Sequence, residues 1–477
     1  MGTLEVQGAI DSPMKDRLTP PARVRAFWDW LTGSQRKLAP IGDRTLGGAE
    51  LRSLRTMLQE SYEGIGGETA VRGRLASILG LYAELGDEGR KVFMKLLIDE
   101  FGADEAAIAG AIATYRATSE PRARRRAESQ LRHALASPRV RILRHFNLLP
   151  EGVKFLVDLR ADVHRYIRQV PELEVIDEEL YALFSSWFDV GNLELRRISW
   201  HSPAVLLEKL ITYEAVHEIR SWSDLRNRMD SDRRCYAFFH PRMSEEPLIF
   251  VEIALVTKMA SNVHALLDEA APRTDPQAAQ AAIFYSISNT QPGLRGVSFG
   301  DFLIKRVVEQ LSSELPKLRT FATLSPVPGF RKWLEARLKA KDASLFGPEE
   351  AITLMGVPGD PYDGLLRFME RELAKDDRTA AMIAPVVTHL VARYLVEEKD
   401  DGRPLDPVAR FHLGNGARLE RINWLADTSP RGMRQSVGVM VNYLYKLGDI
   451  EANHEAYARK GRVTISDGVK RSLRKLP

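Results

Sequence analysis

Hydrophobic side chains recur at helical spacing through the first part of the chain. In residues 51–62, 71–82 and 156–166, apolar positions fall three and four residues apart, so that they share one face of a helix. Segments rich in glycine or proline separate these stretches and supply the stops and starts that helices need. The alternating pattern of a half-buried strand is missing from this part of the sequence. The pattern predicts an all-α helical bundle over residues 1–189.

The pattern changes at about residue 190. Apolar runs that are too short for helices now appear, rich in aromatic and β-branched residues and punctuated by proline. These runs are 235–239, 248–256, 282–287 and 320–324. Helical spacing lies between them, and the first two runs are close enough to pair as an antiparallel hairpin. The sequence therefore predicts a mixed α/β domain over residues 190–477.

Composition is that of a globular protein with more than one domain. The chain has 477 residues, of which 44% are hydrophobic and 28% charged. No uninterrupted apolar run approaches the roughly 20 residues of a membrane span, so we expect no membrane association. The first residues lack the apolar block of a secretory signal and are too acidic for an ordinary transit peptide. We therefore expect a cytoplasmic protein.

Cysteine and charge narrow the chemistry further. Cys235 is the single cysteine, which excludes an internal disulfide and a cysteine-built metal site, and no His-Glu-x-x-His motif is present. The net charge of +4 is too small to indicate nucleic-acid binding. The arginine-rich tract 121–145 could be a nucleic-acid arm, but Leu131, Leu135 and Ile142 give it an apolar side. We interpret it as a helix with a solvated face.

A glycine-rich turn between a strand and a helix is the clearest candidate for a binding site. The segment QPGLRGVSFGDFLIKRVV, residues 291–308, follows the apolar run 282–287 and leads into helical spacing. Such a turn lets backbone N–H groups converge on an anion at a helix N-terminus. It lacks the Gly-Lys-Ser/Thr ending of a P-loop and the spacing of a dinucleotide fingerprint.

The register of this turn resembles the pyrophosphate loop of the GNAT acyltransferase superfamily, Arg/Gln-x-x-Gly-x-Gly/Ala. Arg295 and Gly300 match that pattern, and Ser298 stands where it has its first glycine. The resemblance implies that the loop binds the diphosphate of coenzyme A. Its residues are Arg295, Gly296, Val297, Ser298, Phe299, Gly300 and Asp301.

Longer segments sharpen the resemblance. FFHPRMSEEPLIFVEIAL, FATLSPVPGFRKWL and DPVARFHLGNGARLERINWLADTSPRGMRQSVGVMVNYLY, read together with the glycine-rich turn, resemble the malonyl-CoA decarboxylase family. The resemblance covers the whole α/β part and, more loosely, the helical part. It implies a helical oligomerisation domain followed by a GNAT-like catalytic domain, a homo-oligomer of two or four subunits, and conversion of malonyl-CoA to acetyl-CoA and carbon dioxide. It implies no metal and no organic cofactor.

The implied reaction places physical demands on the site. Loss of carbon dioxide from a malonyl thioester leaves an enolate, which fixed donors must stabilise and a positioned acid must protonate. The resemblance makes Ser325 a catalytic residue that contacts the malonyl carboxylate or relays protons. It makes His412 the proton donor or the residue that orients Ser325, and histidine can change protonation near neutral pH. Tyr445 matches a family tyrosine near the active site, and Lys209 is a candidate to reach a substrate phosphate.

Each of these residues also has a plainer interpretation. Ser325 could be a turn or helix-cap serine, His412 a partly buried structural histidine, Tyr445 an aromatic residue on the core face of a helix, and Lys209 a surface residue. For Ser325 the pattern alone favours the plainer interpretation, and the family resemblance favours catalysis. Many relatives carry a glutamate at the position of Ser298, so a supporting carboxylate is replaced here by a serine.

Two other functions stay open at this stage. The first is an acyl-CoA-dependent N-acyltransferase with an appended helical bundle, which would need a groove and a base for an amine acceptor. The second is a helical protein that uses the arginines at 122 and 124–126 to bind RNA or an acidic partner. Incubation with malonyl-CoA alone separates the first from a decarboxylase, and a salt-sensitive shift with RNA would support the second.

Overall fold

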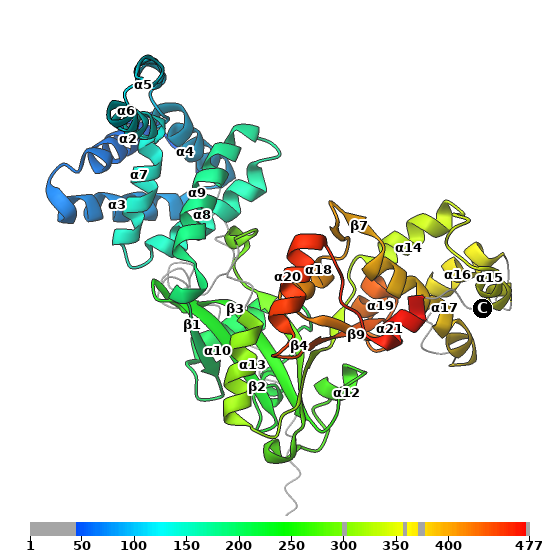
Figure 1. The fold of residues 1–477 in the computed structure, drawn as a ribbon. Helices are drawn as coiled ribbons and strands as arrows, with labels where there is room; N and C mark the ends of the chain where they lie inside the picture. Colours follow the sequence, from blue (N-terminus) through cyan, green and yellow to red (C-terminus); the bar gives the residue numbers. More distant parts are fainter. Residues whose placement is uncertain (1–43, 298–302, 356–359, 371–376, 474–477) are drawn as a thin grey trace, which may run out of the picture. The chain divides into compact units, whose positions relative to one another are not determined.

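The structure is a computed structural model that describes residues 44–297, 303–355, 360–370 and 377–473. Its N-terminal region is helical, as the apolar spacing predicted. The helices are α2 (Gly48–Glu63), α3 (Gly67–Glu84), α4 (Asp87–Glu100), α5 (Glu105–Ala117), α6 (Pro121–Leu135), α7 (Pro138–His145), α8 (Gly152–Tyr166) and α9 (Glu174–Trp187), with short 3₁₀ turns η1 (Phe146–Leu148), η2 (Pro171–Leu173) and η3 (Val190–Asn192) between them (Figure 1).

Sequence features fix the ends and the orientation of these helices. The Asp104 carboxylate caps α5, and Ser137 caps α7 with Pro138 at its first position. Helix α8 is buried on nearly every side and forms the centre of this region, where Leu156 and Leu159 are fully covered. One expectation was wrong: Leu135 does not face the core but is 56% exposed at the end of α6, because α6 packs mainly against the exposed helix α5.

The second region is built on a mixed sheet. Its strands are β1 (Glu194–Ile198), β2 (Arg233–His240), β3 (Met243–Val256), β4 (Ala281–Asn289), β5 (Thr320–Thr323), β6 (Ser325–Pro326), β9 (Arg418–Asn423) and β10 (Met440–Tyr445). The spatial order is β1-β2-β3-β4-β5-β10-β6, and β9 also pairs with β10. All pairs are antiparallel except β4–β5. The predicted hairpin is confirmed, with Cys235 opposite Glu252.

Helices cover the two faces of this sheet. The first ones are α10 (Ala204–Tyr213), α11 (Trp222–Asn227), α12 (His264–Leu267) and α13 (Leu303–Glu314), with the 3₁₀ turns η4 (Pro276–Ala278) and η5 (Pro292–Leu294). The apolar face of α13, including Val307 and Leu311, belongs to the same core as Phe284 of β4 and Phe321 of β5. Figure 1 shows α13 lying along the sheet formed by β2, β3 and β4. The strand–turn–helix order predicted around residues 282–308 is therefore the order of β4, η5 and α13.

The remaining helices gather at the far end of the sheet. They are α14 (Phe330–Lys339), α15 (Pro348–Met355), α16 (Pro361–Glu370), α17 (Asp377–Val396), α18 (Pro407–Gly414), α19 (Pro430–Ser436), α20 (Ile450–Lys460) and α21 (Asp467–Leu473), with a small ribbon of β7 (Lys399–Asp400) and β8 (Arg403–Pro404). By length and composition alone, Arg378–Val396 of α17 could cross a membrane. However, Ile383, Val387 and Leu390 are fully buried in the protein core, which is what a core helix requires.

Candidate active site

Ser325 lies where the sheet splits. Strand β10 pairs with β5 through Leu444 and Tyr445, and with β6 through Met440 and Val441. Ser325 is the first residue of β6, opposite Val441, and only 6% of it is exposed. Its position is therefore set by a strand pairing, not by the turn or helix cap that the plainer interpretation of the sequence offered.

His412 reaches Ser325 from helix α18. Asp406 caps this helix by accepting hydrogen bonds from the N–H groups of Val408 and Ala409. Two turns further on, His412 points into the core with 2% of its surface exposed. Its Nε2 atom lies 3.1 Å from Ser325 Oγ. The sequence placed these two residues in one site, and the structure brings them into hydrogen-bonding contact.

Tyr445 contacts the His412 imidazole on the side opposite Ser325. Its hydroxyl oxygen lies 2.8 Å from His412 Nδ1. Tyr443, two residues earlier on β10, stacks on the same imidazole with ring centroids 4.6 Å apart. Both tyrosines are buried. Tyr445 is thus on a strand, whereas the plainer interpretation placed it on a helix.

The hydrogen bonds around Ser325 define a direction. The Ser325 hydroxyl donates its hydrogen to Thr323 Oγ1 at 2.9 Å. A serine has one hydrogen to donate, so the imidazole is the donor in the bond between His412 Nε2 and Ser325 Oγ. His412 Nδ1 then carries no hydrogen and accepts a hydrogen bond from the Tyr445 hydroxyl. Hydrogen bonds are thus donated by Tyr445 to His412, by His412 to Ser325 and by Ser325 to Thr323, which is the final acceptor, and we call these four residues the relay.

Burial keeps the relay neutral. It lowers the pKa of His412 to about 3 and raises the pKa of Tyr445 well above its usual value. The sequence suggested a histidine that changes protonation near neutral pH. The structure corrects this expectation, because desolvation holds the imidazole uncharged throughout that range. His412 is therefore suited to hold and pass a proton between its two nitrogens.

Thr323 is a site residue that sequence reasoning missed. Its side-chain oxygen also accepts a hydrogen bond from the Tyr443 N–H at 3.1 Å, and its carbonyl accepts one from Asn442 at 2.6 Å. These bonds attach Thr323 to Asn442 and Tyr443, the two residues of β10 that lie between the part paired with β5 and the part paired with β6. Its place two residues before Ser325 was an available signal, because alternate residues of an extended chain point to the same side.

Asp406 lies close both to the helix that carries His412 and to the loop that follows Ser325. It begins the helix that carries His412, and its second carboxylate oxygen faces Gly329 in the loop after Ser325. A Cβ atom at Gly329 would come 2.2 Å from the Tyr394 hydroxyl, so only glycine fits there. Burial raises the pKa of Asp406 to about 6. Ser325 and His412 are thus held by segments that pack directly on each other.

The glycine-rich loop is described only at its start. Arg295 is exposed, Gly296 has a φ of +81°, which favours glycine, and Val297 is buried. The remaining predicted loop residues, Ser298, Phe299, Gly300 and Asp301, lie outside the described residues.

Lys209 is not the surface residue of the plainer interpretation. It is 3% exposed, and its Nζ atom forms an ion pair with Glu246 at 2.8 Å and donates to the Glu245 carbonyl at 2.9 Å. Contact with a substrate phosphate would require the ammonium to leave this buried pair, which is costly.

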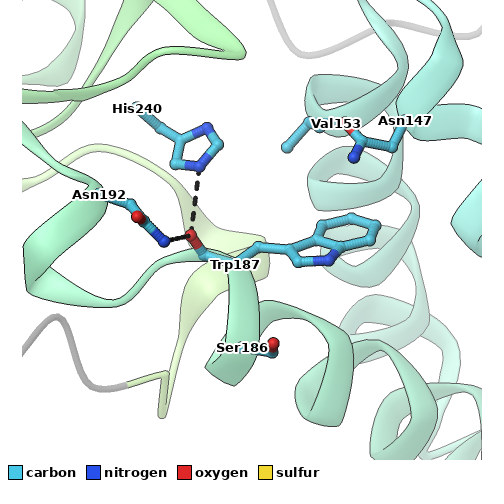
Figure 2. A pocket seen from close by; sticks show the side chains of 6 residues that line it. All are labelled: Asn147, Val153, Ser186, Trp187, Asn192 and His240. Atoms are coloured by element: carbon cyan, nitrogen blue, oxygen red, sulfur yellow. Dashed lines mark hydrogen bonds between the residues drawn. The ribbon is translucent and has the colours of Figure 1, made fainter.

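A pocket of about 180 Å³ lies apart from the relay (Figure 2). Its lining residues are Asn147, Val153, Ser186, Trp187, Asn192 and His240. His240 Nε2 donates to the Trp187 carbonyl at 3.2 Å, and its Nδ1 accepts from the Arg242 N–H. These bonds join β2 to the end of α9, so the polar atoms of His240 connect two packed elements.

Among the described residues, no group of three His, Cys, Asp or Glu side chains is placed to hold a metal ion.

Comparison with known proteins places this geometry in a family. Residues 191–477 match the model of the malonyl-CoA decarboxylase C-terminal domain, and residues 101–188 match that of the N-terminal domain. The chain is 36% identical over 416 residues to the mitochondrial malonyl-CoA decarboxylase of Rattus norvegicus, covering 83% of this chain and 84% of the relative. It is also 37% identical over 398 residues to the mitochondrial enzyme of Anser anser anser, covering 80% of this chain and 79% of the relative.

Solved structures agree with these matches. The crystal structure of malonyl-CoA decarboxylase from Rhodopseudomonas palustris has a TM-score of 0.80 and 43% identity, covering 89% of this chain and 99% of that one. The corresponding structure from Agrobacterium vitis has a TM-score of 0.80 and 42% identity, covering 89% of this chain and 100% of that one. The arrangement of a helical region followed by a mixed sheet is therefore shared with these proteins.

Proposed function

This chain belongs to the malonyl-CoA decarboxylase family, and from that premise we propose a chemical role for each residue of the relay. The enzyme is a carboxy-lyase that converts malonyl-CoA to acetyl-CoA and carbon dioxide. The observation that carries the mechanism is the buried, neutral line of hydrogen bonds from Tyr445 through His412 to Ser325.

The first step is breakage of the carbon–carbon bond. Its electron pair passes into C2 and the thioester carbonyl, and carbon dioxide departs. The carboxylate charge is best lost in poorly solvated surroundings, because the developing enolate spreads the charge over more atoms. Burial of His412 and Tyr445 in uncharged form supports such surroundings beside Ser325.

The second step is protonation of C2. In our proposal the Ser325 hydroxyl turns from Thr323 to the enolate and gives up its proton, which the His412 Nε2–H replaces. His412 Nδ1 takes the proton of Tyr445 in the same movement, and one proton from water per turnover replaces the proton that Tyr445 gives up. Since burial raises the pKa of Tyr445 and disfavours a free tyrosinate, the proton from water must reach Tyr445 in the same coupled movement as the other transfers.

The coenzyme A part of the substrate belongs, in this proposal, on residues 295–301. The support is the position of this loop after β4 and η5 and before α13, together with the left-handed backbone of Gly296. The parallel pair β4–β5 lies next to the split where Ser325 begins β6, so a thioester that follows β4 in a GNAT-like manner would end near the relay. Lys209 is a second candidate for a phosphate contact, at the cost of its pair with Glu246.

The test uses malonyl-CoA without any amine acceptor. We expect carbon dioxide and acetyl-CoA in equal amounts, with kcat lost on replacing Ser325 by alanine and kept on replacing Ser312, whose hydroxyl donates to its own helix at Val308. An N-acyltransferase would leave malonyl-CoA intact until an amine is added. That outcome would replace the decarboxylase by the alternative enzyme.

Three further properties are proposed with the function. Residues 1–189 serve self-association into a dimer or tetramer, which light scattering would measure. The reaction needs no metal or organic cofactor, which dialysis against a chelator would test. The chain acts in the cytoplasm, although the relatives from Rattus norvegicus and Anser anser anser are named mitochondrial, and cell fractionation would decide between the two compartments.

A further inference from the structure

The helical region holds the start of the glycine-rich loop through one arginine. Arg160 of α8 has 4% of its side chain exposed. Its Nη1 atom donates to the carbonyls of Gly293 and Arg295, both at 2.9 Å. Its Nε atom is 2.7 Å from Asp177 of α9, which also lies 2.8 Å from His164. Helix α8 thus carries the guanidinium that bonds to the loop, and Asp177 of α9 holds that guanidinium in place.

The backbone of the turn lies directly against α8. A Cβ atom at Gly293 would come 1.8 Å from the Val157 carbonyl oxygen, so only glycine allows this approach. Leu294 beside it is buried in the common core. The contact between α8 and η5 is therefore close packing between backbones, and the arginine bonds are added to it.

These bonds also set the direction of an N–H group in the loop. The carbonyl of Arg295 and the N–H of Gly296 belong to one planar peptide and point in opposite directions. Because Arg160 holds that carbonyl, the Gly296 N–H points away from the Arg160 guanidinium. A backbone donor fixed in this way costs no reorganisation when an anion binds.

An exposed aromatic ring borders the same place. Tyr181 of α9 is 44% exposed, and its ring lies 5.5 Å from the Arg160 guanidinium. Its Cε2 atom lies 4.0 Å from the position that a Cβ at Gly296 would take. Tyr181 is thus, besides Arg160, a side chain of the helical region that lies next to the described start of the loop. An exposed ring is a suitable surface on which a nucleobase can stack.

We propose that the helical region completes the coenzyme A site. Arg160 is a positioning residue that holds the described start of the loop at Gly293 and Arg295, and Tyr181 contacts the nucleotide part of the ligand. This inference rests on the proposed function, because it assumes that the coenzyme A diphosphate binds at the loop that begins with Arg295, Gly296 and Val297. It gives the helical region a role in substrate binding in addition to self-association.

The test compares Arg160→Met with a matched control, Arg139→Met. Arg139 is equally buried in the helical region, where it pairs with Glu179 and donates to the Leu97 carbonyl. Loss of a charged hydrogen bond from the loop corresponds to roughly tenfold in affinity. We therefore expect KM for malonyl-CoA to rise about tenfold in Arg160→Met, with kcat within about twofold, and KM to stay unchanged in Arg139→Met.

A truncated substrate separates positioning from general damage. Malonyl-N-acetylcysteamine carries the reacting thioester but no diphosphate or nucleotide. We expect Arg160→Met and the unmodified enzyme to turn it over equally. An equal loss on both substrates, or no loss on malonyl-CoA, would overturn the inference. Failure of the unmodified enzyme to decarboxylate malonyl-CoA would instead overturn the proposed function.

A second variant covers the case in which Arg160→Met does not fold. Tyr181 is exposed, so Tyr181→Ala should fold like the unmodified chain. We expect it to raise KM for malonyl-CoA at least about fivefold, in line with the value of one base–aromatic stack, and to leave turnover of malonyl-N-acetylcysteamine unaffected. An unchanged KM for malonyl-CoA would show that the nucleotide does not bind at Tyr181.

Discussion

Replacing Tyr445 by phenylalanine removes one oxygen atom from the relay and leaves the ring in place. The hydroxyl is the partner of His412 Nδ1 at 2.8 Å. Without it, the tautomer that presents Nε2–H to Ser325 loses its support, because Nδ1 is left as a buried acceptor without a donor. The structure therefore predicts a loss of turnover with little change in substrate affinity.

The magnitude follows from the hydrogen bond. A neutral bond of this kind contributes about 0.5–1.5 kcal/mol net, and a buried group left unsatisfied costs about 1–3 kcal/mol. Loss of the hydrogen bond alone lowers kcat about 2- to 13-fold, since about 1.4 kcal/mol is a factor of ten. Because phenylalanine also has no proton to pass to His412, the full loss should be larger, toward the roughly 100-fold typical of a positioned proton donor. The free energy of unfolding should fall by about 1–3 kcal/mol through the unsatisfied imidazole.

Tyr443→Phe is the matched control. Tyr443 is also buried and stacks on His412, but its hydroxyl has no hydrogen-bond partner within the described part of the chain. Loss of that oxygen should leave kcat within about twofold and leave stability unchanged or slightly higher. Steady-state kinetics with malonyl-CoA and urea unfolding of both variants provide the comparison. Equal kcat values in Tyr445→Phe and Tyr443→Phe would refute the assigned role of Tyr445.

Further predictions concern the other groups. Ser325→Ala should lower kcat at least 100-fold, the loss typical of a positioned proton donor, while calorimetry still detects acetyl-CoA binding; loss of binding instead would make Ser325 a substrate anchor. Gly296→Val should raise the Kd for coenzyme A at least tenfold, since its φ of +81° strains a branched residue; an unchanged Kd would make the loop structural. The pKa of His412 is about 3 in the folded state and about 6.5 in the unfolded state, so the unfolded state binds the extra proton as the pH falls. The free energy of unfolding should therefore fall by about 1.4 kcal/mol between pH 8 and pH 5.5. His412→Gln should remove this part of the pH dependence, and an unchanged pH profile in that variant would contradict the buried neutral imidazole. Dialysis against a chelator should leave kcat unchanged, and recovery of lost activity by one added metal would contradict the cofactor proposal.

Local patterns were sufficient to predict much of the fold. The runs at 235–239, 248–256, 282–287 and 320–324 correspond to β2, β3, β4 and β5, because each is apolar on both faces and bounded by turn residues. The helical region followed from spacing alone. Strand β6 is only two residues long, and no periodicity can reveal it.

The relay depends on contacts that local patterns do not contain. Ser325 and His412 are 87 residues apart, and they meet because β10 pairs with both β5 and β6 while α18 packs beside them. The lowered pKa of His412 has the same origin, since desolvation depends on what covers the ring. The family resemblance named Ser325, His412 and Tyr445, but the order of donors and the part of Thr323 required coordinates.

A crystal structure of Ser325→Ala with bound malonyl-CoA tests the central claim most directly. The account predicts the diphosphate on residues 295–301 and the malonyl group within hydrogen-bonding distance of His412 Nε2, in the space left by the Ser325 hydroxyl. A diphosphate bound elsewhere, or a malonyl group remote from His412, would contradict it.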